Sequence, residues 1–81
     1  MQPIRRTNLI KLRVEHGLTR KQLAEILDIS EVFVAKIEYG LENPSRNTAL
    51  KFEAFYQISE RVLFADLFID RNTIKNEHRR Q

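Results

Sequence analysis

The feature that most constrains the fold is a pair of short helical segments with very few residues between them. Apolar side chains recur with helical spacing over about residues 20–27 and 31–39, and only residues 28–30 separate the two segments. Because the connection is so short, the two helices must cross steeply. The crossing requires a small side chain where the helices approach each other, and Ala24 occupies that place.

The residues around this connection have the chemistry that such a crossing needs. Asp28 stands at the turn, where the backbone must be left-handed; glycine is usual there, and aspartate is an acceptable second choice. Apolar residues follow at positions that would close a shared core: Leu23, Leu27, Ile29, Val34 and Ile37. This is the spacing of a helix-turn-helix, a motif that places its second helix in the major groove of DNA.

The rest of the chain also has helical periodicity, and the alternation typical of strands is absent. We expect three further helices over about residues 5–16, 46–56 and 60–68, which gives an all-α fold of five helices. Residue types typical of helix ends support these bounds, with glycine as the stop and a hydroxyl side chain as the N-cap: Gly17, Gly40, Thr19, Ser30 and Ser45. The expected organisation is one domain over residues 1–70 and a basic tail over 71–81.

Composition excludes several classes of protein. The chain of 81 residues has no cysteine, so a disulfide framework and a cysteine-based zinc site are excluded. No apolar run approaches the roughly 18 residues of a membrane span, and the start lacks the apolar stretch of a signal peptide. We therefore expect a cytoplasmic protein without a membrane partner.

Catalytic motifs are missing as well. The two histidines, His16 and His78, stand far apart in the sequence, and no glycine-rich phosphate loop, nucleophile motif or metal-ligand spacing occurs. We expect His16 to lie on the inner side of the first helix as a helix-end residue. The sequence thus argues against an enzyme, and it predicts no metal and no cofactor.

The net charge of +3 is unevenly distributed. Residues 1–13 contain Arg5, Arg6, Lys11 and Arg13 and no acidic residue, and residues 71–81 contain four basic residues against Glu77 alone. Basic ends on a small domain suit a polyanion such as nucleic acid, and they equally suit a surface that keeps the protein in solution.

Taken together, Leu9 to Phe64 resemble the lambda-repressor-like, Cro/C1-type (XRE family) helix-turn-helix domain. The segments that carry the resemblance align without a gap: Leu12-Arg13, Gly17-Leu18-Thr19, Leu23-Ala24, Ile29-Ser30, Phe33-Val34-Ala35-Lys36-Ile37-Glu38, Gly40, Asn43-Pro44-Ser45, and Ile58-Ser59 leading to Leu63-Phe64. The resemblance implies a compact five-helix domain that binds double-stranded operator DNA, usually as a dimer. It also implies that the helix over residues 31–39 enters the major groove.

The outward positions near the start of that helix are the candidates for base contacts: Glu31, Val32, Phe33 and Lys36. Lys36 can reach guanine O6 and N7, Val32 and Phe33 can touch a thymine methyl group, and Glu31 can accept from cytosine N4. Because this face has no Asn, Gln or Arg, we expect limited direct readout and a larger share from DNA shape. Two alternatives stay open: Phe33 packs partly against residues 20–27, and Glu31 only complements the helix dipole.

The resemblance places phosphate contacts at the start of the helix over 20–27 and in the loop after residue 39. The matching positions are Thr19, Arg20, Lys21, Asn43, Ser45 and Arg46. The family often has glutamine at the position of Arg20, so this chain keeps a phosphate donor there and adds a charge. The alternative is that Arg20, Lys21 and Arg46 are solvated surface residues.

Two further roles concern structure and assembly. The resemblance implies a salt bridge between Arg13 and Glu38 that fixes the angle at which the second helix of the motif is presented. The apolar stripe that ends in Phe64, Leu67 and Phe68 is longer than one small core needs, so it predicts a homodimer interface. Alternatively, this stripe folds back on the first helix to cover Ile4 and Ile10.

These observations lead to two hypotheses of function. The first is a sequence-specific DNA-binding transcription regulator, most simply a repressor that occludes a promoter by binding a pseudo-palindromic operator as a dimer. The second is an antitoxin-like or anti-repressor module that keeps the fold and binds a partner protein. The apolar pair Val32-Phe33 and the acidic Glu31 favour the second hypothesis.

Overall fold

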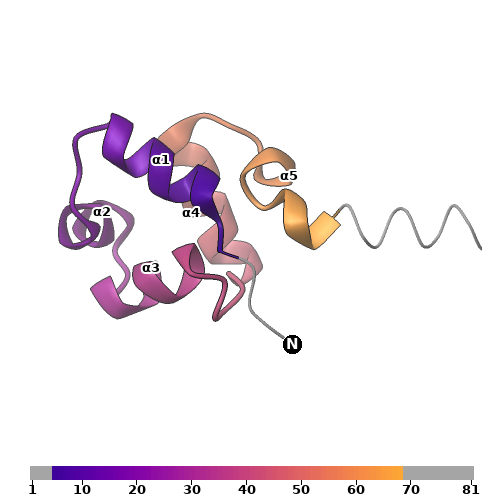
Figure 1. Ribbon diagram of the computed structural model, residues 1–81, viewed down its shortest axis with the longest axis horizontal. Helices are drawn as coiled ribbons and strands as arrows, with labels where there is room; N and C mark the ends of the chain where they lie inside the picture. Colours follow the sequence, from indigo (N-terminus) through magenta and orange to yellow (C-terminus); the bar gives the residue numbers. More distant parts are fainter. Residues whose placement is uncertain (1–4, 69–81) are drawn as a thin grey trace, which may run out of the picture.

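The computed structural model describes residues 5–68, and this part of the chain contains helices and connections but no strand. The helices are α1 (Thr7–Glu15), α2 (Arg20–Leu27), α3 (Glu31–Glu38), α4 (Arg46–Tyr56) and α5 (Glu60–Leu63). Figure 1 shows α2 and α3 at one end and α5 at the other, with α1 and α4 between them. The all-α fold expected from the sequence is confirmed for this part of the chain.

Hydroxyl side chains begin three of these helices, as predicted. Thr19, Ser30 and Ser45 each accept a hydrogen bond from the backbone N–H three residues further on, which satisfies a donor that the helix itself cannot use. Asp28 ends α2 with a left-handed backbone at φ 59°, and its N–H donates back to the last turn of α2. The turn between α2 and α3 therefore has the geometry that the sequence required.

The core lies where α1, α2 and α3 meet α4 and the segment that follows α5. Ala24, on α2, is only 4% exposed and belongs to the core, and α2 and α3 are the most closely packed pair of helices. Four of the five apolar residues expected around the turn are buried, and Ile29 is half-buried against the core. The small residue thus allows the steep crossing that positions α3.

The predicted continuous helix over residues 60–68 is wrong in one respect. Helix α5 ends at Leu63, Phe64 leaves the helical region at φ −118° and ψ 45°, and residues 65–68 form a new helical turn. On an unbroken helix, Leu63 and Phe64 would point in directions about 100° apart. The break allows both side chains to be 1% exposed, with the Phe64 ring edge-on to Phe52 at 5.6 Å between centroids.

Helix α1 begins at Thr7, two residues later than predicted, because the preceding residue is engaged elsewhere. The backbone N–H of Arg6 donates to the carbonyl oxygen of Glu38 at 2.7 Å, which holds the start of α1 against the end of α3. The predicted tail over residues 71–81 and Ile4 lie outside the described residues.

Candidate nucleic-acid interface

Helix α3 has one buried face and one exposed face. Val34, Ile37 and Glu38 are at most 1% exposed, whereas Glu31 and Lys36 are exposed and Val32 is 63% exposed. Three of the four candidate base-contacting side chains thus lie on the solvent side of a helix whose opposite face is anchored in the core. An α-helix presented in this way fits the major groove of B-DNA.

Phe33 is different from the other three candidates. It is half-buried and packs against the core, which is in the direction of the packing alternative, although a specific contact with residues 20–27 stays a prediction. Glu31 lies in the first turn of α3, where its charge complements the helix dipole. A base contact by either residue stays a prediction.

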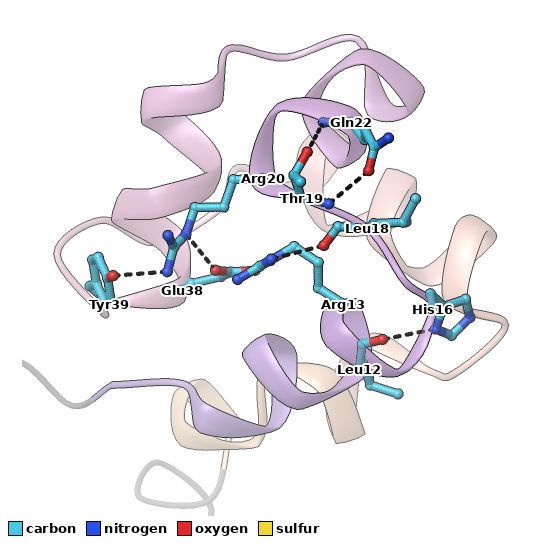
Figure 2. A network of polar contacts seen from close by, with 9 residues as sticks. All are labelled: Leu12, Arg13, His16, Leu18, Thr19, Arg20, Gln22, Glu38 and Tyr39. Atoms are coloured by element: carbon cyan, nitrogen blue, oxygen red, sulfur yellow. Dashed lines mark hydrogen bonds and ion pairs between the residues drawn. The ribbon is translucent and has the colours of Figure 1, made fainter.

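The start of α2 is closed by a capping box. The Thr19 hydroxyl oxygen accepts from the Gln22 N–H at 3.1 Å, and the Gln22 side-chain oxygen accepts from the Thr19 N–H at 2.9 Å (Figure 2). The N–H groups of Arg20 and Lys21 have no acceptor within the helix itself, and the Lys21 side chain is exposed. These groups suit an anion approaching the end of α2.

Arg20 is directed to the end of α3 instead of into solvent. Its Nε donates to Glu38 Oε1 at 2.9 Å and its Nη2 donates to the Tyr39 hydroxyl at 2.8 Å, with the guanidinium 4.8 Å from the Tyr39 ring centre (Figure 2). The interpretation of Arg20 as a solvated surface residue is therefore wrong. The guanidinium links the first residue of α2 to the last turn of α3.

The ion pair between Arg13 and Glu38 is present, and it shares its carboxylate with Arg20. Arg13 Nε donates to Glu38 Oε2 at 2.8 Å, and Arg13 Nη1 donates to the Leu18 carbonyl at 2.9 Å. Glu38 is 0% exposed, so each of its oxygens is desolvated and receives one guanidinium N–H. The Glu38 carboxylate of α3 thereby links this helix to α1 through Arg13 and to α2 through Arg20.

A sequence profile described as helix-turn-helix matches residues 9–63. The chain belongs to the Cro/C1-type helix-turn-helix (XRE) family. No curated protein and no solved structure matches the chain. The family consists of DNA-binding domains of transcription regulators and is not typically enzymatic, which identifies DNA as the class of ligand.

The loop between α3 and α4, together with the first residue of α4, carries the other phosphate candidates of this XRE-family domain. Ser45 is the exposed N-cap of α4, and the Arg46 side chain is 77% exposed with a 3.3 Å ion pair to Glu60. The Asn43 side-chain oxygen accepts from Arg6 Nη2 at 2.7 Å. All three residues lie on one short stretch that follows α3 directly.

The role of Arg6 was not predicted from the sequence, in which Arg6 is one of several basic residues near the N-terminus. In this XRE-family domain Arg6 is 3% exposed, and its charge is neutralised by both carboxylate oxygens of Asp66 at 3.1 Å. It also donates to the carbonyl oxygens of Ile37 at 2.6 Å and Glu42 at 3.2 Å. Arg6 and Asp66 are 60 residues apart, so no local pattern links them.

The predicted dimer residues divide into two groups. Phe64 is 1% exposed within its own chain, so its assignment to a dimer interface is wrong: the break after α5 turns its ring into the core. Leu67 is half-buried against the same core, and Phe68 is half-buried with Arg61 lying 4.9 Å from its ring centre. The Phe64 ring lies edge-on to Phe52 of α4 and has the Arg6 guanidinium 5.5 Å from its centre, whereas cover of Ile4 and Ile10 by this stripe stays a prediction.

Other sequence predictions concern catalysis and the membrane. His16 is the C-cap of α1, the helix-end position that was predicted. It is exposed, but its ring lies towards α4, 5.6 Å from the Phe55 ring and 5.2 Å from the Tyr56 ring between centroids, and its Nδ1 lies 2.8 Å from the Leu12 carbonyl oxygen. Within residues 5–68, no cluster of His, Cys, Asp and Glu is arranged to hold a metal ion. None of the helices in the same part of the chain has the length and apolar character needed to cross a membrane.

Tyr56 is a buried residue with an incompletely satisfied polar group. Its hydroxyl has no hydrogen-bond partner among the described residues, although its ring packs in the core. The pKa of Tyr56 is raised to about 12, mainly by burial and also by the negative charge of Glu38, while the positive charge of Arg13 opposes the shift. The hydroxyl therefore stays protonated at neutral pH. Its raised pKa indicates that the surroundings of Tyr56, which include the charges of Glu38 and Arg13, are desolvated.

Proposed function

We propose that this XRE-family chain is a sequence-specific transcription regulator that binds operator DNA with α3 in the major groove. The observation that carries the proposal is the division of α3 into an anchored face and an exposed face. Val34 and Ile37 fix the helix in the core, and Glu31, Val32 and Lys36 are left for base edges.

Phosphate contacts on both sides of α3 would set its register in the groove. The start of α2 offers the exposed side chains of Thr19 and Lys21, and the loop after α3 offers Asn43, Ser45 and Arg46. Arg20 contributes through its remaining N–H groups while it holds Glu38. Such contacts position a protein on the duplex without reading sequence, and they make affinity fall steeply with salt.

Base readout by α3 rests mainly on one polar side chain. Lys36 is the only long basic residue on the exposed face, and Val32 supplies an apolar contact for a thymine methyl group. We therefore infer that the shape and flexibility of the DNA contribute a large share of specificity.

A homodimer is the arrangement that best suits a repressor of this size. Val62 is 62% exposed and Phe68 is half-buried, so the C-terminal side of the domain retains apolar surface for a second copy. Two-fold symmetry would place two copies of α3 about one DNA turn, roughly 34 Å, apart and require a pseudo-palindromic operator. Occlusion of a promoter is the simplest mode of action.

One observation favours a second function, that of an antitoxin-like or anti-repressor module that binds a partner protein. Val32 is 63% exposed beside the half-buried Phe33, and this apolar surface on α3 also suits a protein surface. The two functions differ in their dependence on Lys36, because only base readout requires its ammonium group.

Selection of bound sequences from a random pool of duplex DNA tests the proposal. We expect enrichment of two inverted half-sites whose centres lie about one helical turn apart. The absence of both enrichment and binding at about 50 mM salt would exclude the DNA function. Enrichment of a single half-site would retain DNA binding and exclude the symmetric dimer.

A further inference from the structure

The Arg6 guanidinium occupies a buried junction between the DNA-facing loop and the C-terminal part of the domain. It contacts the end of α3 through the Ile37 carbonyl, the loop after α3 through the Glu42 carbonyl and Asn43, and the turn after α5 through Asp66. These contacts use Nε, Nη1 and Nη2 of a side chain that is 3% exposed. Arg6 therefore fixes where the loop lies relative to α3.

The chemistry of a guanidinium decides how the Asn43 amide is oriented. Arginine has only donors, so an amide beside it must present its oxygen and turn its NH2 group away. The Asn43 oxygen lies 2.7 Å from Arg6 Nη2, and within residues 5–68 the NH2 group forms no hydrogen bond. Asn43 is exposed, as are Ser45 and Arg46, which follow it closely in the sequence, so we infer that this donor is accessible from solvent.

We propose that Arg6, held by Asp66, is a positioning residue for DNA binding, because it fixes the Asn43 amide with its NH2 group outward as a donor to a backbone phosphate. This inference rests on the proposed DNA function, and it adds the residues that hold the loop between α3 and α4 in place for binding. Asp66 fixes the guanidinium through two parallel hydrogen bonds at 3.1 Å, a geometry that only a planar fork allows. This positioning role does not require Arg6 itself to contact DNA.

Asn43→Asp separates the positioning role from a purely structural one. The carboxylate still accepts from Arg6, and the hydrogen bond becomes charge-assisted, so we expect the melting temperature to be retained or raised. The phosphate donor is lost and a like charge is added, so affinity for random-sequence duplex DNA at about 100 mM salt should fall at least tenfold. Asn43→Ala should give an intermediate loss.

Gln57→Glu is the matched control, because it makes the same change in charge at the exposed far end of α4. A charge more than a Debye length from the DNA is largely screened, so the affinity of this variant should stay near that of the wild type. If Asn43→Asp binds as tightly as Gln57→Glu, Asn43 is not a phosphate donor and the inference is overturned. If the wild type binds no DNA, the proposed function itself fails.

Asp66→Asn tests whether Arg6 acts through Asn43. Loss of the carboxylate frees the guanidinium, so affinity should fall several-fold in the wild-type background, measured well below the melting temperature of each variant. In the Asn43→Ala background, Asp66→Asn should cause a clearly smaller loss of affinity, because the positioned amide is already gone and only the placement of the rest of the loop is still affected. An equal loss in both backgrounds would show that Arg6 does not act through Asn43 and would overturn the proposal.

Discussion

Arg20 Nε lies 2.9 Å from Oε1 of Glu38, on a carboxylate that is 0% exposed. Arg13 occupies the other oxygen, so a single buried charge joins three helices. The backbone carbonyl of the same glutamate accepts from the Arg6 N–H at 2.7 Å. The end of α3 is therefore held by its charge and by its backbone, and the exposed face of the helix is fixed relative to the rest of the domain.

Glu38→Gln should be strongly destabilising. The substitution removes the only acidic partner that Arg13 has among residues 5–68, together with one partner of Arg20, and leaves a buried guanidinium without that counter-charge. Loss of one partner of a buried pair costs about 3–5 kcal/mol, which urea denaturation at neutral pH would measure. Glu25→Gln, at an exposed position of α2, is the control and should change stability by less than about 0.5 kcal/mol. Equal stability of the two variants would contradict the role of Glu38.

Arg20→Ala should lower stability even though Arg20 lies at the edge of the proposed DNA surface. The hydrogen bonds to Glu38 and Tyr39 are lost, but Arg13 still neutralises the carboxylate. Hydrogen bonds to charged groups contribute about 1.5–3 kcal/mol, and partial exposure of the Arg20 side chain places the expected loss near the lower end. Lys21→Ala removes the same charge from an exposed neighbour and should leave the urea midpoint unchanged. If Arg20→Ala is as stable as Lys21→Ala, the contacts of Arg20 with Glu38 and Tyr39 do not stabilise the domain, and Arg20 is better explained as a free phosphate donor.

Local signals in the sequence predicted most of the helix-turn-helix. The bounds of α2 and α4, the three hydroxyl N-caps and the left-handed Asp28 follow from residue types within one or two turns of each other. The Arg13–Glu38 pair was predicted only through the family resemblance, since spacing alone does not reveal a contact across 25 residues.

The contacts that were not predicted are those between residues far apart in the sequence. From the sequence alone, Arg6 and Arg20 are both interpreted as surface charges, because no neighbouring residue indicates that a buried carboxylate lies close to them in the fold. The break at Phe64 was missed for a related reason: helical periodicity continues through it, and only the packing of Phe64 against Phe52 on α4 favours the interruption.

Tyr56→Phe should stabilise the domain at neutral pH. The Tyr56 hydroxyl is buried without a partner among the described residues, whereas the ring contributes to the core. An unsatisfied buried polar group costs about 1–3 kcal/mol, and phenylalanine keeps the ring while removing that group. Thermal and urea denaturation should show a gain of about 1 kcal/mol. A loss of stability would show that the hydroxyl has an acceptor in solution, such as an ordered water molecule.

The raised pKa of Tyr56 also predicts a loss of stability in alkali. The folded-state pKa of about 12 lies above the ordinary value of 10.0, so the contribution is fully present below pH 10 and is lost as pH rises towards 12. Two pKa units correspond to about 2–3 kcal/mol. Urea midpoints between about pH 9 and pH 12 should fall more steeply for the wild type than for Tyr56→Phe, since both proteins share all other titrating groups. Parallel curves would contradict the desolvation of this hydroxyl.

Lys36→Ala should change which DNA sequences are bound more than how tightly DNA in general is bound. The exposed Lys36 side chain is the only long basic group on the outward face of α3, so its ammonium is the expected partner of guanine O6 and N7. Selection with the variant should lose preference at one position of each half-site, equivalent to about 1–3 kcal/mol of discrimination, while other positions keep theirs. Lys11→Ala, on the exposed side of α1, removes the same charge and should keep the full wild-type preference. If Lys36→Ala selects the wild-type sequence unchanged, α3 is not the base-reading helix, and its exposed Val32 is better explained by a protein partner.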